Sequence, residues 1–211
     1  YYLASYTDFL GLQYLSAGME RIILFVYPTI VLLLQRLIFG TPIKPVQWLA
    51  TVICYLGIGP AFSGADFTVG NQFGLGVALV FSSALTYSCF VIGGGYFAKK
   101  LGSVRFTSLA LVAASTGVLL HVYLSGNTLF GYPAGLYAYG VTLAIFCTVI
   151  PTYMVTEGIR RIGAGDAAIL GATGPVATIV LEYFILGEHL NLVQAAGAAL
   201  VIVGVVLIGR T

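Results

Sequence analysis

The chain has 211 residues, of which 59% are hydrophobic and 8% are charged, and its formal net charge is +2. A soluble domain carries about 25% charged residues, so this composition excludes an ordinary soluble fold and favours a protein embedded in a lipid bilayer. The nine Lys and Arg residues are scattered and form no basic stripe, so nucleic-acid binding is not expected. The three cysteines lie far apart in apolar runs, and neither a metal site nor a cofactor is expected.

Apolar runs and the residues that interrupt them predict eight membrane helices, because about 20 apolar residues cross the hydrocarbon core. In chain order these helices are expected at residues 1–15, 20–39, 46–62, 72–98, 104–125, 134–160, 166–186 and 191–209. Short segments rich in Gly, Pro, Ser, Asn and Asp connect several of them, as is typical of turns. The predicted fold class is an all-α polytopic membrane protein.

The positive charges predict the orientation of these helices. If alternate connections face the same side, eight of the nine Lys and Arg residues share one side and only Arg21 lies on the other. Positive residues concentrate on the cytoplasmic side of membrane proteins. The C-terminus is therefore expected to be cytoplasmic.

The chain also resembles itself at an offset of 147 residues, which aligns the second and third predicted helices with the last two without a gap. The matched positions include Pro28 with Pro175, Gly40 with Gly187, Gln47 with Gln194, and Gly57 with Gly204. The paired helices are five apart in the chain, so they cross the membrane in opposite directions. The sequence therefore predicts an inverted repeat, an architecture that recurs in secondary transporters.

The offset also predicts the domain organisation. The second repeat is expected to begin near Gly70, so residues 70–211 form the second repeat and residues 1–69 form the C-terminal part of the first. By the same offset, the first repeat would begin well before Tyr1. The intact protein is expected to have ten helices in two halves of five, of which eight are visible here.

Three parts of the sequence resemble the EamA-like group of the drug/metabolite transporter superfamily. They are Leu15-Ser16-Ala17-Gly18 through Pro28 to Gly40, Ala84-Leu85-Thr86-Tyr87 to Lys99-Lys100-Leu101, and Gly163-Ala164-Gly165-Asp166 through Pro175 to Leu186-Gly187-Glu188. In this family an acidic residue usually follows the glycine that ends each of these helix pairs. The second half has Glu188 at that position, but the first half departs from the pattern with Thr41. The resemblance implies a bacterial inner-membrane exporter of small metabolites such as amino acids. Carriers of nucleotide sugars or phosphorylated compounds are the alternative that it leaves open.

Two prolines lie near the middle of their predicted helices and at the repeat offset. Pro28 and Pro175 each lack a backbone donor, which is expected to free the carbonyls of Leu24 and Gly171 toward a cavity. Their symmetric positions favour pseudo-symmetric hinges near a substrate site. A static kink that only fits neighbouring helices is the alternative.

Asp8 lies inside an apolar helix with no cation close in sequence, where a charge is costly and usually functional. Three interpretations stay open: binding of substrate or a proton, an ion pair with a helix before Tyr1, and an aqueous vestibule. Glu20 and Arg21 open a helix at the outer face, where Glu20 suits the helix dipole. Glu157 precedes Arg160 and Arg161 by three and four residues, which predicts a local ion pair.

Tyrosines and hydroxyl side chains are distributed around the two prolines and predict a lined passage for an amphipathic solute. The candidate cavity residues are Tyr6, Asp8, Tyr27, Pro28, Thr29, Thr86, Tyr87, Thr152, Tyr153, Thr173, Pro175 and Thr178. Interhelical packing is the alternative for each single residue, because Ser and Thr also bond their own helix backbone.

An enzyme or a non-transporting scaffold is the alternative from another functional class. The pattern Gly163-Ala164-Gly165-Asp166 resembles intramembrane aspartyl proteases, but helix N-capping is sufficient reason for Asp166. The sequence contains no polar catalytic cluster, and a scaffold gives no reason for a repeat. Ala195, Ala196, Gly197 and Gly204 make the last helix small-faced, which permits close packing within the bundle or against another copy in a homodimer.

Overall fold

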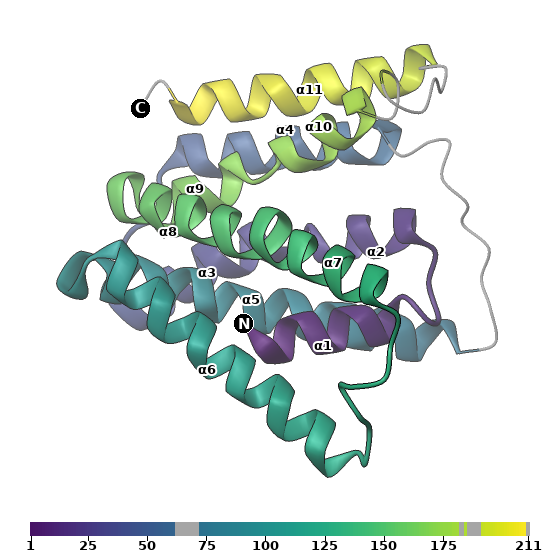
Figure 1. Ribbon diagram of the computed structural model, residues 1–211. Helices are drawn as coiled ribbons and strands as arrows, with labels where there is room; N and C mark the ends of the chain where they lie inside the picture. Colours follow the sequence, from purple (N-terminus) through teal and green to yellow (C-terminus); the bar gives the residue numbers. More distant parts are fainter. Residues whose placement is uncertain (62–71, 182–183, 185–190, 210–211) are drawn as a thin grey trace. The chain divides into compact units, whose positions relative to one another are not determined.

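The computed structural model describes residues 1–61, 72–181, 184 and 191–209, and every regular element among them is helical. In chain order the elements are α1 (Tyr2–Gly11), α2 (Ala17–Leu24), α3 (Tyr27–Phe39), α4 (Pro45–Ala61), α5 (Phe73–Leu101), α6 (Ser103–Leu124), α7 (Ala134–Leu143), the π-helical segment η1 (Ala144–Val149), α8 (Ile150–Ile162), α9 (Ala164–Leu170), α10 (Thr173–Leu181) and α11 (Leu192–Gly209) (Figure 1). Each of the eight predicted segments contains helix, so the all-helical fold class is confirmed.

Within the described residues, five helical stretches are long and apolar enough to cross a bilayer. They are Gly18–Phe39, Phe73–Leu101, Ser103–Leu124, Ala134–Ile162 and Leu192–Gly209. The helix α4 is also apolar but shorter, at 17 residues. The chain is therefore a polytopic helical membrane protein.

The first and sixth predicted segments differ from the structure in detail. The helix expected over residues 1–15 ends at Gly11, because the N–H groups of Gln13 and Tyr14 bond three residues back and tighten the chain into a turn. The segment predicted at 134–160 runs to Ile162 but contains the π-helical turn η1. Pro151 lies in the first turn of α8, directly after η1, and its missing N–H accounts for the interrupted α-helical bonding there.

The chain divides into two compact units. The first unit consists of Tyr1–Tyr2 and Gly93–Gly163, and it contains the end of α5 together with α6, α7, η1 and α8. The second unit consists of Leu3–Ile92 and Ala164–Thr211, and it contains the remaining helices and most of α5.

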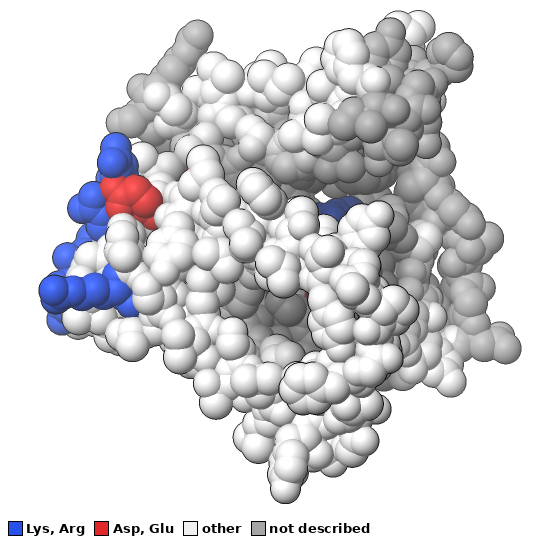
Figure 2. Space-filling model, viewed as in Figure 1, with Lys and Arg blue, Asp and Glu red and all other residues white. Residues whose placement is uncertain are grey.

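In the first unit, α6 packs against α8. Thr107 of α6 and Thr156 of α8 are fully buried, and a Cβ atom added to Gly94 of α5 would lie 3.6 Å from Phe106 and 3.7 Å from Ile159. The basic residues Lys99 and Lys100 end α5, and Arg160 and Arg161 end α8. Figure 2 shows Lys and Arg residues at one edge of the visible face, next to a single acidic patch.

In the second unit, the closest helix packing joins α4 and α11. A Cβ atom added to Gly57 would lie 2.6 Å from the carbonyl oxygen of Gly197 and 2.8 Å from the backbone nitrogen of Val201. A Cβ atom added to Gly204 would lie 2.6 Å from the Cys54 sulfur and 2.9 Å from the Ala50 oxygen. These glycines allow the two backbones to approach closely, as small residues commonly do between membrane helices.

A shift of 147 residues relates each position of α4 to an equivalent position of α11, and equivalent positions make equivalent contacts between the two helices. Gly57 faces Val201, and Gly204 faces Cys54, which are the positions that the shift interchanges. Contact positions rise along α4 as they fall along α11, so the two helices are antiparallel. Gly197 and Gly204 of the predicted small face therefore pack against α4, whereas Ala195 and Ala196 are exposed.

Both of these helices also begin in the same way. The Lys44 N–H donates to Oε1 of Gln47 over 2.9 Å, and the Asn191 N–H donates to Oε1 of Gln194 over 3.0 Å. In each case a side chain from the first turn reaches back to the residue before the helix, as in one half of a capping box. Lys44 and Asn191 are themselves 147 residues apart.

The start of α9 differs from the prediction. The helix begins at Ala164, so Asp166 lies inside its first turn and is not the N-cap residue. Its Oδ1 atom instead accepts a 2.7 Å hydrogen bond from Nε2 of Gln47. This contact joins α9 to α4 in the second unit.

Candidate functional site

Regular α-helical hydrogen bonding is interrupted in both of the helices that carry the repeat prolines. The segment predicted at 20–39 breaks between Leu24 and Tyr27, and the segment predicted at 166–186 breaks between Leu170 and Thr173. Pro28 therefore lies in the first turn of α3, where a missing N–H costs little. Pro28 still lies near the middle of the apolar helical stretch Gly18–Phe39, but in both cases regular α-helical bonding restarts one or two residues before the proline.

Backbone carbonyl groups at the two breaks accept hydrogen bonds from N–H groups three residues later. The Gly171 carbonyl accepts a 3.0 Å hydrogen bond from the Gly174 N–H, so the free carbonyl predicted there is wrong. The Ala172 N–H donates to the Ile169 carbonyl, which is also a tight bond spanning three residues. At the other break the Val26 N–H donates to the Ile23 carbonyl in the same way.

Tyr27 joins three helices at the first break. Its hydroxyl donates a 2.8 Å hydrogen bond to the Ala168 carbonyl of α9, and its own carbonyl accepts a 3.2 Å bond from the Ser88 hydroxyl of α5. A Cβ atom at Gly171 would overlap the Tyr27 hydroxyl, so a glycine is required at the second break. Tyr27 thus fills the space that the interrupted helix leaves.

Aromatic rings surround Tyr27 within the second unit. The Tyr27 ring meets the Tyr87 ring edge to face at 5.3 Å between centroids and the Phe25 ring at 5.9 Å. Tyr55 of α4 contacts Phe25, and its hydroxyl shares a 2.5 Å bond with the Thr29 hydroxyl. We call Phe25, Tyr27, Thr29, Tyr55 and Tyr87 the Tyr27 cluster. It offers aromatic surfaces and neutral hydroxyl groups from α3, α4, α5 and the preceding turn.

Asp8 lies in a second polar group of the same unit. Its polar neighbours are the Glu20 carboxyl, the Arg21 guanidinium and the Ser83 hydroxyl, which come from α2 and α5. The Glu20 side chain is 3% exposed, and its Oε2 atom lies 3.4 Å from Nε of Arg21. The sequence predicts Glu20 at the outer face of the membrane but does not predict its burial beside Asp8.

A sequence signal for this pairing does exist. Asp8 lies one helical turn before the end of α1, and Glu20 lies one turn after the start of α2. A short connection makes consecutive helices antiparallel neighbours, so residues at equal distances from the turn come side by side.

Several other predicted cavity residues make local or packing contacts. Thr86 donates to the Ser82 carbonyl of its own helix, and Thr173 donates to the Leu170 carbonyl across the second break. In the first unit, the hydroxyls of Tyr153 and Ser108 share a 2.7 Å bond between α8 and α6.

The remaining predicted residues are spread over both units. Thr152 donates to the Thr148 carbonyl in the first unit, and Tyr6 is exposed on α1 in the second. The side chains of Pro175 and Thr178 lie outside the described residues. The structure thus brings Tyr27, Pro28, Thr29 and Tyr87 together, while a single cavity lined by the whole predicted set stays a prediction.

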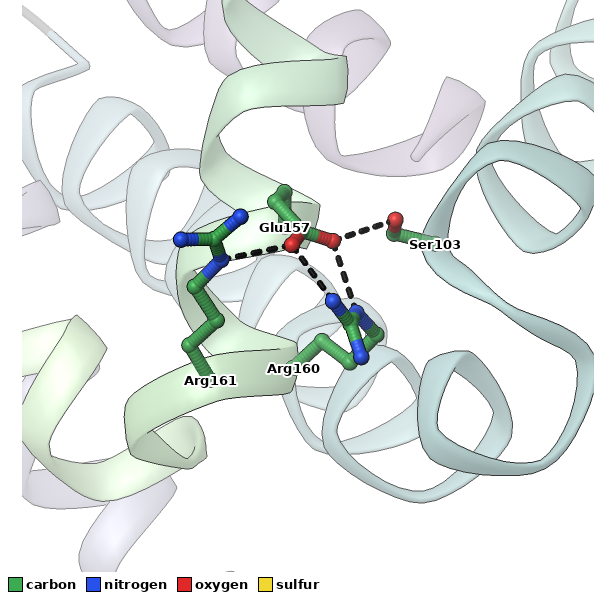
Figure 3. A network of polar contacts seen from close by, with 4 residues as sticks. All are labelled: Ser103, Glu157, Arg160 and Arg161. Carbon is green, nitrogen blue, oxygen red and sulfur yellow. Dashed lines mark hydrogen bonds and ion pairs between the residues drawn. The ribbon is translucent and has the colours of Figure 1, made fainter.

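The predicted local ion pair at Glu157 is confirmed, and it extends further than expected (Figure 3). Arg160 donates to both carboxylate oxygens over 2.7 and 2.6 Å, and Arg161 donates to Oε1 over 2.6 Å. The Ser103 hydroxyl donates to Oε2 over 2.6 Å and so connects the start of α6 to α8. Among the described residues, no three His, Cys, Asp or Glu side chains are grouped closely enough to hold a metal ion.

Known proteins resemble this chain over nearly all its length. A transporter from Bacillus subtilis, YcbK, which is described as uncharacterized, is 29% identical over 93% of this chain and 65% of its own length. The uncharacterized transporter sll1319 of Synechocystis is 24% identical over 95% of this chain and 61% of its length. The uncharacterized inner membrane transporter YedA of Escherichia coli K12 is 22% identical over 93% of this chain. The chain thus spans 61–65% of the length of these relatives, which is less than two thirds.

A solved crystal structure supports the fold. It superposes on 99% of this chain with a TM-score of 0.82 at 15% sequence identity, and the match covers 74% of that structure's chain. Residues 74–210 match the sequence profile described as the EamA-like transporter family. This match covers more than half of the chain, and the chain belongs to the EamA-like transporter family.

Proposed function

We propose that the full-length protein is a secondary carrier that exports small amphipathic metabolites, amino acids among them, across a bacterial inner membrane by alternating access. The observation that carries this proposal is the exchange of contacts between α4 and α11 under the 147-residue shift. Such an exchange is expected of two inverted halves that meet about a pseudo-twofold axis, where residues 1–69 are the C-terminal part of the first half and residues 70–211 are the second. Two halves related in this way can rock against each other and expose one site to each side in turn.

The helix breaks support the same mechanism. Both breaks precede a proline at the repeat offset, and the hydroxyl of Tyr27 bonds across from α3 to α9. A hinge needs a few residues at element ends that absorb backbone rotation, which an interrupted helix provides. Phe25–Val26 and Gly171–Ala172 are therefore the proposed hinges.

The Tyr27 cluster supports an amphipathic substrate. Aromatic rings and hydroxyls bind a solute that has both an apolar part and hydrogen-bonding groups. Tyr27, Thr29 and Tyr87 are the proposed substrate residues, and Tyr6, Thr86, Thr152, Tyr153, Thr173 and Thr178 stay candidates for other parts of the passage.

The membrane placement is proposed from the relatives and the charge distribution. YedA is named as an inner membrane transporter, and eight of nine cations fall on one predicted side. This side is proposed to be cytoplasmic, with the C-terminus there. A homodimer would have to use a surface other than the glycine face of α11, since Gly197 and Gly204 pack against α4.

The proposal is tested by measuring metabolites inside and outside bacteria that express the full-length protein. The informative variant is Tyr87→Ala, which removes a ring that contacts Tyr27. The matched control is Tyr139→Ala on α7, because the Tyr139 side chain is 74% exposed. Membrane abundance of each variant is measured in parallel.

We expect one or more amino acids to accumulate outside cells that express the wild type or Tyr139→Ala, and not outside cells with equally abundant Tyr87→Ala. Export of nucleotide sugars or phosphorylated compounds instead would replace the proposed substrate class. If neither class differs between wild-type cells and cells without the protein, the carrier function is wrong.

A further inference from the structure

Asp8 and Glu20 form a carboxyl pair on either side of the connection between α1 and α2. Each lies one turn from that connection, and Ser83 of α5 completes the group. The neighbouring helices pack closely here, since a Cβ atom at Gly11 would lie 2.5 Å from Val80. The pair is therefore part of the helix interface and not of a flexible loop.

The two carboxyl groups have unequal surroundings. Glu20 is 3% exposed and has Arg21 at 3.4 Å, while the Arg21 side chain itself is 60% exposed. The Oδ1 atom of Asp8 is buried and accepts no hydrogen bond from the described residues. An acceptor without a donor is costly in a buried position, which indicates that a hydrogen-bearing group belongs there.

The charges within this group do not balance. Among the described residues, two ionised carboxylates against one guanidinium leave one negative charge uncompensated in a poorly solvated place. Like charges in contact cannot both stay ionised when they are shielded from water. One added proton makes the group neutral, with a protonated carboxyl, a carboxylate and a guanidinium.

We propose that Asp8 and Glu20 share one exchangeable proton and form the site that couples proton movement to transport. The inference rests on the proposed carrier function and adds its driving ion. A proton from water forms an O–H bond with one carboxylate oxygen, and that hydroxyl donates to the other carboxylate. When the proton leaves to water, the pair carries two negative charges and is stable only in a conformation that hydrates it.

A proton fits this group better than a metal cation. A sodium ion would need several oxygen ligands and would lie close to the positive guanidinium of Arg21, which repels it. The proton requires only the two carboxyl oxygens and leaves the ion pair of Glu20 with Arg21 intact. Coupling then follows from the difference in hydration that the protonated and deprotonated pairs require.

The experiment uses the full-length protein reconstituted into liposomes and has two measurements. Infrared spectroscopy as a function of pH detects the protonated carboxyl group directly. Efflux and counterflow of an amino-acid mixture, with and without an imposed pH gradient, measure coupling. The variants are Asp8→Asn and Glu20→Gln, and the matched control is Glu157→Gln, whose carboxylate lies in the other unit.

We expect a protonated carboxyl band at neutral pH in the wild type and in Glu157→Gln, and its loss in both Asp8→Asn and Glu20→Gln. Acceleration of efflux by the pH gradient should be lost in these two variants, while counterflow persists. If the wild type lacks the band, or if both variants respond to the gradient as the wild type does, the inference is wrong. If the wild type transports no amino acid but keeps the band, the proposed substrate class fails while the proton site stands.

Discussion

The two units bury their membrane helices to different extents. In the first unit, 6% of the most apolar stretch of α6 is buried inside the protein. In the second unit, 28% of the most apolar stretch of α11 is buried. In the second unit, helices far apart in the chain share glycine contacts and aromatic rings, and the consecutive helices α1 and α2 share a carboxyl pair. The comparison shows that the features proposed for transport concentrate where helices pack most closely.

The acidic residues sharpen this difference. Glu157 in the first unit pairs with arginines three and four residues away, and these arginines are well exposed, Arg161 by 71%. Glu20 in the second unit is buried and approaches a carboxyl group from another helix. The first arrangement follows from helical spacing alone, and the second depends on how helices are rotated against each other.

The largest expected effect is at the contact between α4 and α11. The substitutions Gly57→Val and Gly204→Val would each place a side chain against the backbone of the partner helix. We expect each to cost roughly 3 kcal/mol or more, the upper end of the overpacking range, because a backbone cannot give way as a side chain can. Thermal unfolding of the full-length protein in detergent, followed by fluorescence-detected gel filtration, measures the loss.

The control is Gly59→Val on the same helix, since nothing lies within 4 Å of a Cβ atom there. It introduces the same β-branched side chain and should change the unfolding temperature much less. A similar loss in all three variants would show that helix propensity and not close packing determines the outcome. Unequal losses at Gly57 and Gly204 would count against the pseudo-symmetric arrangement.

Much of the fold follows from the sequence. Every predicted span contains helix, because runs of apolar residues long enough for a bilayer have few alternatives to helix. The offset of 147 residues identified Gly57 and Gly204, which the structure brings into equivalent contacts. The ion pairs of Glu157 with Arg160 and Arg161 were also predictable, since residues three and four apart share a helix face, but the bond from Ser103 was not.

The helix breaks and the carboxyl pair were not predicted. A proline in an apolar run is compatible with a kink or with a new helix start, and only packing at Tyr27 and Gly171 decides between them. Helix rotation is also poorly encoded, because a membrane helix that is apolar on all sides carries little amphipathic signal. Glu20 was therefore assigned from its position along the helix and not from the face on which it lies.

A smaller effect is expected at the second helix break. Gly171→Ala would place a methyl group where the Tyr27 hydroxyl lies and so displace its hydrogen bond to Ala168. We expect a cost of about 1–2 kcal/mol, since a buried donor and acceptor lose their partner. The same unfolding assay measures it, and Gly174→Ala, with open space at its Cβ position, is the matched control.

A double substitution separates steric from helix-propensity effects at this break. In Gly171→Ala with Tyr27→Phe, the hydroxyl that would clash is gone, and the ring carbon Cζ lies 3.2 Å from the added Cβ. The cost of the pair should therefore be smaller than the sum of the two single costs. Additive costs would mean that Tyr27 and Gly171 do not depend on each other.

The smallest effect is expected at Glu157. Glu157→Gln removes the charge that three donors share, but the arginines are largely hydrated and the network is screened by salt. We expect a small decrease in unfolding temperature at low salt that disappears at high salt. Glu20→Gln removes a buried charge that salt does not screen, so its effect on the unfolding temperature should persist at high salt. If Glu157→Gln proved the more damaging of the two at every salt concentration, exposed local pairs would matter more than buried pairs between helices, and the contrast between the units would be reversed.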